Sequence, residues 1–317
     1  MGNRDESVRA TGEFGLIARV VRRLAGTPGT LVGPGDDAAV VAAPDGRVVA
    51  STDVLVDGRH FRRDWSSARD VGHRAAAANL ADLAAMGATG TALLVALCAP
   101  PDLDAAWAEE LADGLAAECA EVGAGVVGGD MSSSPTLTIC VTALGDLAGR
   151  PPVLRSGARP GDVVALAGRI GHAAAGYSVL SRGFRSPRLL VDAYRRPVVP
   201  YAAGPAAALA GATAMIDVSD GLLADLGHVA AASGVAINVR RDALPVPPQL
   251  RDAAAALGVD PYSWILAGGD DHPLVATFPA SAGLSAEWTV IGRVAEGSGV
   301  TADGEPYSGP RGWDHFS

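Results

Sequence analysis

The sequence predicts a two-domain protein with mixed sheets, of the α/β or α+β class, and three observations support this. Its 317 residues exceed the usual size of one domain. Short apolar runs with strand character alternate with stretches of helical spacing along the chain. A segment rich in proline and glycine, residues 149–162, separates two such halves. We therefore expect one domain over residues 1–150 and another over residues 151–317.

A β-hairpin is expected near the start of the first domain. Two β-prone runs, residues 38–43 and 47–50, flank the sequence Pro44-Asp45-Gly46. Proline presets φ and glycine accepts a positive φ, so this sequence favours a tight turn between paired strands. Such a hairpin would bring Asp37 and Asp53 nearly opposite one another.

After the hairpin, helices and strands alternate. Ser67 and Asp70 resemble a capping box, which predicts a helix running to residue 86 with Gly87 as its C-cap. On that helix Asp82 lies in line with an otherwise apolar stripe, so its carboxylate is either misplaced or a ligand. The other expected helices are 14–24, 103–122, 173–180, 202–210, 222–232 and 249–257, and the other expected strands are 91–99, 124–127, 136–144, 163–167, 213–216, 235–239, 274–278 and 289–294.

Charge and the choice of basic residue exclude several classes of function. The net charge of −10 argues against nonspecific nucleic-acid binding, although bound metal ions would still permit a phosphorylated substrate. All 25 basic side chains other than histidine are arginines. The absence of lysine excludes the Walker P-loop, the protein-kinase fold and Schiff-base chemistry.

Cysteine usage and hydropathy predict a cytoplasmic protein with no membrane partner. Cys98, Cys119 and Cys140 are widely spaced in apolar surroundings without a CxxC motif, and we expect buried, reduced thiols. Residues 1–9 are charged and show no secretory signal. The longest apolar run, about residues 92–99, is too short to span a bilayer.

Several aspartates share a setting that suits a divalent cation. Each lies at a strand end or on a helix face, beside glycine or another small residue, and Ser51 and Thr52 add hydroxyl oxygens near one of them. Oxygen ligands of this kind favour Mg²⁺. Helix caps and Asx-turns are the alternative, and N-capping alone would explain Asp220. The aspartates are Asp37, Asp53, Asp82, Asp130, Asp217 and Asp220.

Other motifs are weaker. The run 128–130 (GGD) follows an expected strand, where its N–H groups can bind phosphate or simply form a turn. Arg155 can clamp a phosphate or be a solvated linker charge. His60 and His272 are candidates for bases or substrate contacts, although a lone histidine is more often neither. No nucleophile elbow is present.

Motifs with recognisable sequences occur along nearly the whole chain, at residues 12–17 (GEFGLI), 35–38 (GDDA), 51–53 (STD), 58–61 (GRHF), 79–87 (NLADLAAMG), 128–130 (GGD), 155–158 (RSGA), 217–222 (DVSDGL) and 313–316 (WDHF). Together they are similar to those of the thiamine-monophosphate kinases. That family belongs to the superfamily of aminoimidazole-ribonucleotide synthetase and selenophosphate synthetase. The resemblance implies two α/β domains, a homodimer formed by sheet pairing of the N-terminal domains, and ATP with several Mg²⁺ ions in the cleft between domains.

The resemblance also implies roles for individual residues. Mg²⁺ would be held by Asp37, Ser51, Thr52, Asp53, Asp82, Asp130 and Asp217, with a further ion at Asp220. ATP would contact Gly129, Asp130, Arg155 and Ser219, and thiamine phosphate would contact His60 and Trp313. Where the family usually has Gly-Glu-Asp-Tyr, this chain has Gly269-Asp270-Asp271-His272, so the substrate-contacting carboxylate at Asp270 is one methylene shorter.

The expected reaction is ATP-dependent phosphorylation of thiamine monophosphate to thiamine diphosphate. The accepting phosphate oxygen is already ionised, so no general base is needed, and bound Mg²⁺ offsets the repulsion between two polyanions. One alternative is another enzyme of the superfamily. A selenophosphate synthetase would need a reactive cysteine in an N-terminal glycine-rich loop, and all three cysteines lie elsewhere. The other alternative is a noncatalytic Mg–nucleotide-binding scaffold, against which the complete set of ligands argues.

Overall fold

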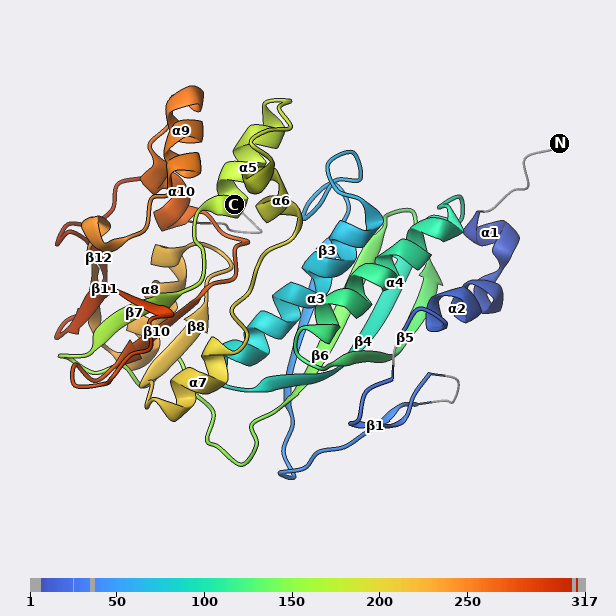
Figure 1. The fold of residues 1–317 in the computed structure, drawn as a ribbon, viewed down its shortest axis with the longest axis horizontal. Coiled ribbons are helices and arrows are strands. Elements are labelled where there is room, and N and C mark those ends of the chain that lie inside the picture. Colours follow the sequence, from blue (N-terminus) through green and yellow to red (C-terminus); the bar gives the residue numbers. More distant parts are fainter. Residues whose placement is uncertain (1–6, 25, 35–37, 310–311, 313–317) are drawn as a thin grey trace. The chain divides into compact units, whose positions relative to one another are not determined.

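The computed structural model describes residues 7–24, 26–34, 38–309 and 312 (Figure 1). The chain divides into two compact units. The first comprises the residues up to 83 together with 89–148, and the second comprises 84–88 together with the residues from 149 onward. Both units have mixed α and β structure around their own sheet, which confirms the predicted fold class.

The first unit is built on a four-stranded sheet in the order β3-β6-β4-β5, in which only β4 and β5 run parallel. A separate antiparallel pair joins β1 to β2. No helix in the described part of the chain is long and apolar enough to cross a membrane. The elements are α1 (Val8–Thr11), α2 (Glu13–Val21), β1 (Thr30–Val32), β2 (Val40–Val41), β3 (Val49–Val56), α3 (Ala68–Ala85), β4 (Thr89–Ala99), α4 (Ala105–Ala120), β5 (Gly125–Ser133) and β6 (Thr138–Asp146).

The predicted turn at residues 44–46 is present, but the predicted hairpin is wrong. Gly46 has a φ of 74° and its N–H donates to the carbonyl of Ala43 at 3.0 Å. The two-residue strand β2 pairs with β1, however, and β3 pairs with β6 along all eight of its residues. A turn signal fixes only the turn, and β3 gains a far longer ladder from β6 than β2 could offer. Asp37, the expected partner of Asp53, lies outside the described residues.

Helices α3 and α4 cover one face of this sheet (Figure 1). Their contact depends on two glycines, because a Cβ at Gly72 would lie 2.2 Å from the carbonyl oxygen of Leu111, and one at Gly114 would lie 2.1 Å from that of Arg69. The predicted capping box is also present, since the N–H of Ser67 donates to Asp70 Oδ2 at 3.0 Å and the N–H of Asp70 to Ser67 Oγ at 3.2 Å. Small residues therefore let the two helices pack closely.

The opposite face of the sheet carries exposed apolar side chains. By strand register, Val54 and Leu94 point away from the helices, and they keep 45% and 38% of their surface exposed. Cys98 and Cys140 share this face and are only half-buried. All three cysteines are free, as expected, but only Cys119 is buried; burial raises the pKa of its thiol to about 12. The expectation of burial is wrong for the other two because alternate residues of β4 and β6 face away from α3 and α4.

The second unit contains a six-stranded sheet in the order β12-β9-β11-β7-β10-β8, in which only the β12–β9 pair is parallel. Alternate residues of its central strands point to opposite faces of the sheet, and each face contributes to a separate hydrophobic core. The elements are β7 (Val163–Ala167), α5 (His172–Ser181), α6 (Arg188–Arg195), α7 (Ala203–Leu209), β8 (Ala214–Asp217), α8 (Leu222–Ser233), β9 (Ala236–Val239), the 3₁₀ helix η1 (Arg241–Ala243), α9 (Pro248–Leu257), α10 (Pro261–Ala267), β10 (Leu274–Phe278), β11 (Trp288–Ala295) and β12 (Gly299–Ala302).

Both faces of strand β8 are buried, and this fixes the loop that follows it. Ile216 packs in the core with Leu222 and Leu226 of α8, whereas Met215 packs in the other core with Ala203 of α7. The last residue of the strand, Asp217, is itself only 4% exposed. The loop from β8 to α8 therefore leaves a strand whose two faces are both buried.

Candidate active site

In the first unit, two of the sequence motifs meet where β3 lies against α3. The hydroxyl of Ser51 donates to Asp82 Oδ2 at 2.5 Å. The N–H of Asp53 donates to Asn79 Oδ1 at 3.1 Å, and the amide of Asn79 in turn donates to the carbonyl of Ala75 at 2.9 Å. The stretch 51–53 and the helix segment 79–82 are thereby joined by side-chain hydrogen bonds, although they are far apart in sequence.

The alternation of β3 divides the predicted ligands between two faces of the sheet. Ser51 and Asp53 face α3, as does the buried Leu55. The hydroxyl of Thr52 lies on the other face, where it donates to the carbonyl of Val141 at 2.9 Å. The structure thus brings Ser51, Asp53 and Asp82 together, but it does not bring the Thr52 hydroxyl to them.

The donors around Asp82 fit a hard cation. They are hydroxyl and carboxylate oxygens, which suit Mg²⁺, and no cysteine or histidine joins them in the described contacts. Within the described residues no three carboxylate, histidine or cysteine side chains lie close enough together to form a metal site by themselves. Asp37, which the sequence adds to this set, falls outside those residues.

The run 128–130 lies inside a strand, so the prediction of a turn or loop after a strand is wrong. Strand β5 continues to Ser133, and Gly129 pairs with Val95 of β4. A Cβ at Gly129 would lie 1.9 Å from the carbonyl oxygen of Val95, so glycine is needed for this pairing. The next residue, Asp130, is exposed and, by register, lies on the face opposite to Asp53. Strand pairing with a long β4 overrides the local turn tendency of two glycines.

His60 lies in the loop that follows β3. Its Nδ1 accepts a hydrogen bond from the N–H of Val56 at 3.0 Å, so the ring proton of the neutral side chain is on Nε2. The ring is partly exposed. A histidine held in this way presents an N–H group that suits a phosphate or carbonyl oxygen.

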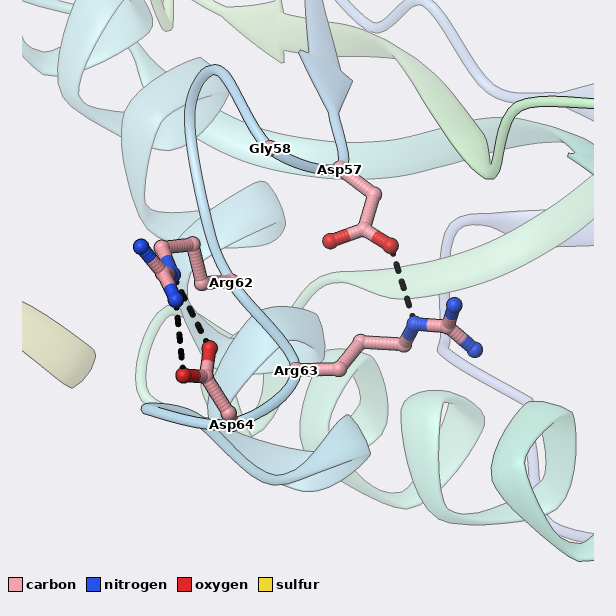
Figure 2. A pocket seen from close by; sticks show the side chains of 5 residues that line it. All are labelled: Asp57, Gly58, Arg62, Arg63 and Asp64. Carbon is pink, nitrogen blue, oxygen red and sulfur yellow. Dashed lines mark hydrogen bonds and ion pairs between the residues drawn. The ribbon is translucent and has the colours of Figure 1, made fainter.

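The same loop lines a pocket of about 310 Å³ that sequence reasoning missed (Figure 2). Arg62 makes two hydrogen bonds to Asp64, at 2.8 and 2.9 Å, and Arg63 makes one to Asp57 at 2.9 Å. The Arg62 guanidinium also lies 4.5 Å from the centre of the Trp65 ring. Two arginines directly after the 58–61 motif were the available signal for this pocket.

In the second unit, a buried carboxylate organises the loop that carries Ser219 and Asp220. Oδ2 of Asp225, in the first turn of α8, accepts hydrogen bonds from the N–H groups of Ser219, Asp220 and Gly221, each at 3.1 Å. Burial, with Asp217 nearby, raises the pKa of Asp225 to about 7. The residue that precedes the helix is Gly221, so Asp220 is not its N-cap. The N-capping explanation for Asp220 is therefore wrong, and its predicted metal role stays a prediction.

The loop that contains Asp270 is bonded to this first loop along the backbone. The N–H of Asp270 donates to the carbonyl of Ser219 at 2.9 Å, and the N–H of His272 donates to that of Val218 at 3.1 Å. A Cβ at Gly269 would lie 1.9 Å from the oxygen of Ser219, so only glycine permits this approach. The Asp270 side chain is exposed. The stretches 217–221 and 268–272 consequently form one structural unit.

The two residues after Asp270 face inward. Oδ1 of Asp271 accepts from the N–H of Ala173 at 2.9 Å, at the start of α5, and burial raises the pKa of Asp271 to about 7. His272 Nδ1 lies 2.9 Å from Asp217 Oδ2, and both side chains are buried. His272 is thus in contact with Asp217, and its candidate role as a base or substrate contact stays a prediction.

The remaining predicted residues have simpler settings. Arg155 is exposed, and its carbonyl accepts from the Ser233 hydroxyl at 2.8 Å, which anchors its backbone. Trp313 lies outside the described residues. The roles predicted for these two residues stay predictions.

Comparison with known proteins decides the family. Residues 35–147 match the model for the N-terminal domain of AIR synthase related proteins, and residues 159–305 match the model for the C-terminal domain. A thiamine-monophosphate kinase of Mycobacterium tuberculosis is 50% identical over 314 residues, which is 98% of this chain and 93% of the relative. The chain belongs to the thiamine-monophosphate kinase family.

Solved structures of thiamine-monophosphate kinases share the fold. The enzyme of Stenotrophomonas maltophilia K279a superposes with a TM-score of 0.80 at 33% identity, covering 92% of this chain and 95% of its own. The structure described as AaThiL complexed with AMPPCP and TMP gives a TM-score of 0.81 at 33% identity, covering 96% and 97%. The similarity to thiamine-monophosphate kinases therefore extends over both units.

Proposed function

We propose that the chain transfers the γ-phosphoryl group of ATP to thiamine monophosphate and so forms thiamine diphosphate. The observation that carries this proposal is the 50% identity to a thiamine-monophosphate kinase over 98% of the chain. A related solved structure is described as a complex with AMPPCP and TMP, which supports the choice of an ATP-like donor and this acceptor. We place the reaction in the cytoplasm, where ATP is available.

Mg²⁺ is the proposed metal, and the oxygen donors of the chain fit it. In the first unit Asp53 and Asp82 would hold it, with the hydroxyl of Ser51 fixed against Asp82 at 2.5 Å. In the second unit Asp217 and Asp220 would do so. When bound, Mg²⁺ would offset the negative charge of the two phosphorylated substrates. Asp37 is proposed for the same set, whereas Thr52 and Asp130, whose side chains lie on the opposite face of the sheet from Asp53, would hold a different ion.

The protein side chains have positioning roles in this proposal, because the accepting phosphate oxygen is already ionised and needs no base. Nε2–H of His60 would donate to an oxygen of thiamine monophosphate, since Nδ1 of that ring is occupied by the N–H of Val56. Asp270, exposed on its loop, would face the organic end of the acceptor. Trp313 would contact the same substrate, and Gly129, Asp130, Arg155 and Ser219 would contact ATP.

The enzyme is proposed to act as a homodimer through the open face of the first sheet. That face carries Val54 and Leu94, which are 45% and 38% exposed, among small and half-buried residues of β4 and β6. Pairing of two such faces would bury the apolar side chains of both copies. Light scattering would show twice the chain mass, and Leu94→Asp would shift the protein toward the monomer.

A turnover assay tests the proposal. The purified chain is incubated with ATP, Mg²⁺ and thiamine monophosphate, and ADP and thiamine diphosphate are measured over time. Equal amounts of both products are expected. ATP that binds without turnover would indicate the noncatalytic scaffold, and turnover with a different acceptor only would indicate another enzyme of the superfamily.

A further inference from the structure

We propose that His272 is a positioning residue that fixes the carboxylate of Asp217 for metal binding. This inference rests on the proposed function, in which Asp217 holds Mg²⁺. It concerns a contact inside the second unit, between the loop before β10 and the end of β8. Nothing else in the described contacts gives the Asp217 carboxylate a side-chain donor.

The geometry of the pair sets the direction of the hydrogen bond. His272 Nδ1 lies 2.9 Å from Asp217 Oδ2, and the two side chains are 8% and 5% exposed. A carboxylate only accepts, so Nδ1 carries the proton and donates it. One oxygen of Asp217 is then held by the imidazole, and the lone pairs of Oδ1 can be directed to a cation. Donors of this kind commonly orient metal-binding carboxylates.

The backbone around His272 holds the ring in place. Its φ is +52° and that of Asp270 is +67°, which are backbone conformations that residues other than glycine rarely adopt. The His272 N–H donates to the carbonyl of Val218 at 3.1 Å, and the N–H of Val218 donates to that of Pro273 at 2.9 Å. These bonds tie both sides of the loop to the residue that follows Asp217. The imidazole is thus presented by a hydrogen-bonded loop to a buried strand end.

Nδ1 of histidine lies close to the backbone, and from there it reaches Asp217. A purely structural ion pair is the competing explanation, and buried pairs of this kind often add little to stability. The two explanations differ in what they predict for metal affinity.

Two substitutions of His272 that tolerate a positive φ distinguish the positioning role from a purely structural ion pair. His272→Gly removes the donor without straining the backbone, and His272→Asn keeps an N–H donor near the position of Nδ1. Binding of AMPPCP is titrated calorimetrically at several Mg²⁺ concentrations, so that no turnover is needed. We expect His272→Gly to weaken Mg²⁺-dependent binding about tenfold or more, the usual effect of removing such a partner. His272→Asn should stay within about threefold of the wild type.

Three controls make the outcome decisive. Added imidazole should restore binding to His272→Gly by filling the vacated space and should leave the wild type unchanged. His228→Asn, at an exposed histidine of α8, should bind as the wild type does. Asp217→Asn should weaken Mg²⁺-dependent binding by itself.

If Asp217→Asn weakens binding and His272→Gly does not, the inference is wrong while the proposed function stands. The inference is also wrong if His272→Gly and His272→Asn weaken binding equally without a response to imidazole. Unchanged binding by Asp217→Asn would contradict both the inference and the proposed metal role of Asp217.

Discussion

The hydroxyl of Ser51 donates to Asp82 Oδ2 at 2.5 Å, joining strand β3 to helix α3. The aspartate lies on the face of α3 that also carries Asn79, and the hydroxyl is held on the side of the strand that faces this helix. The contact holds a hydroxyl oxygen and carboxylate oxygens side by side, and such oxygens are ligands that a hard cation prefers. The pair thus supports a ligand role for Asp82.

Asp82→Asn should abolish kinase activity and preserve the fold. The amide keeps the shape and the contact with Ser51 but removes the charge that a cation requires. Turnover at limiting Mg²⁺ is measured beside the circular dichroism spectrum, with Asp252→Asn, an exposed residue of α9, as the matched control. Unchanged turnover at limiting Mg²⁺ would exclude Asp82 as a ligand.

Asp225→Ala should loosen the loop that carries Ser219 and Asp220. Three N–H groups lose their common acceptor, and unsatisfied buried donors cost about 1–3 kcal/mol each when water cannot reach them. We expect a lower Tm and a raised KM for ATP. Asp225→Asn, which keeps an acceptor oxygen, should recover most of both. If Asp225→Ala lowers Tm but leaves KM for ATP unchanged, Asp225 supports only the fold.

Asp271 gives the stability of the protein a pH dependence. Burial, and then the nearby Asp270, raise the pKa of this carboxyl from 3.8 to about 7, and the N–H of Ala173 only partly opposes this. Below about pH 4 both the folded and unfolded states hold the proton. As the pH rises to 7 the unfolded chain releases it first, so the stability contributed by the neutral acid is lost across that interval.

Asp271→Asn should remove this loss. The amide cannot ionise, and its oxygen still accepts from Ala173. Between pH 5 and pH 8 the variant should gain on the order of 2 kcal/mol in free energy of unfolding relative to the wild type. Its Tm should therefore rise relative to that of the wild type over this interval. Parallel Tm profiles over this interval would show that Asp271 is already ionised at pH 5.

Asp270→Glu restores the residue that the family usually has. A shorter side chain withdraws the carboxylate by about 1.5 Å, the length of one C–C bond, which can turn a direct hydrogen bond into a water-mediated one. The hydrogen bond from the N–H of Asp270 to the carbonyl of Ser219 fixes the backbone of this loop. We therefore expect KM for thiamine monophosphate to change less than tenfold. A larger improvement would indicate that another acceptor fits this pocket better.

Much of this fold follows from local sequence patterns. The capping box at Ser67 and Asp70, the helix that it begins, and the alternating strands of both units appear where helical and strand spacing predict them. The meeting of the 51–53 and 79–87 motifs could be anticipated only from the family resemblance, which assigns residues of both motifs to Mg²⁺. The helices, strands and capping box depend on residues that are close together in the sequence.

Strand partners and buried supporting contacts could not be predicted in this way. The pairing of β3 with β6, and the inclusion of Gly129 in β5, depend on which distant strand offers the longer ladder. Asp225 and His272 act through contacts that only the folded chain creates, because their partners are backbone N–H groups and a carboxylate from another strand. Local spacing contains no signal for either contact.

The fate of the γ-phosphoryl group of ATP tests the central claim most directly. ATP labelled at the γ-phosphate is mixed with Mg²⁺, thiamine monophosphate and an excess of the chain, and the products of a single turnover are separated. We predict that the label appears in the terminal phosphate of thiamine diphosphate, and that Asp82→Asn forms no labelled product. Label released only as inorganic phosphate, or none transferred at all, would contradict the assignment of this chain as a thiamine-monophosphate kinase.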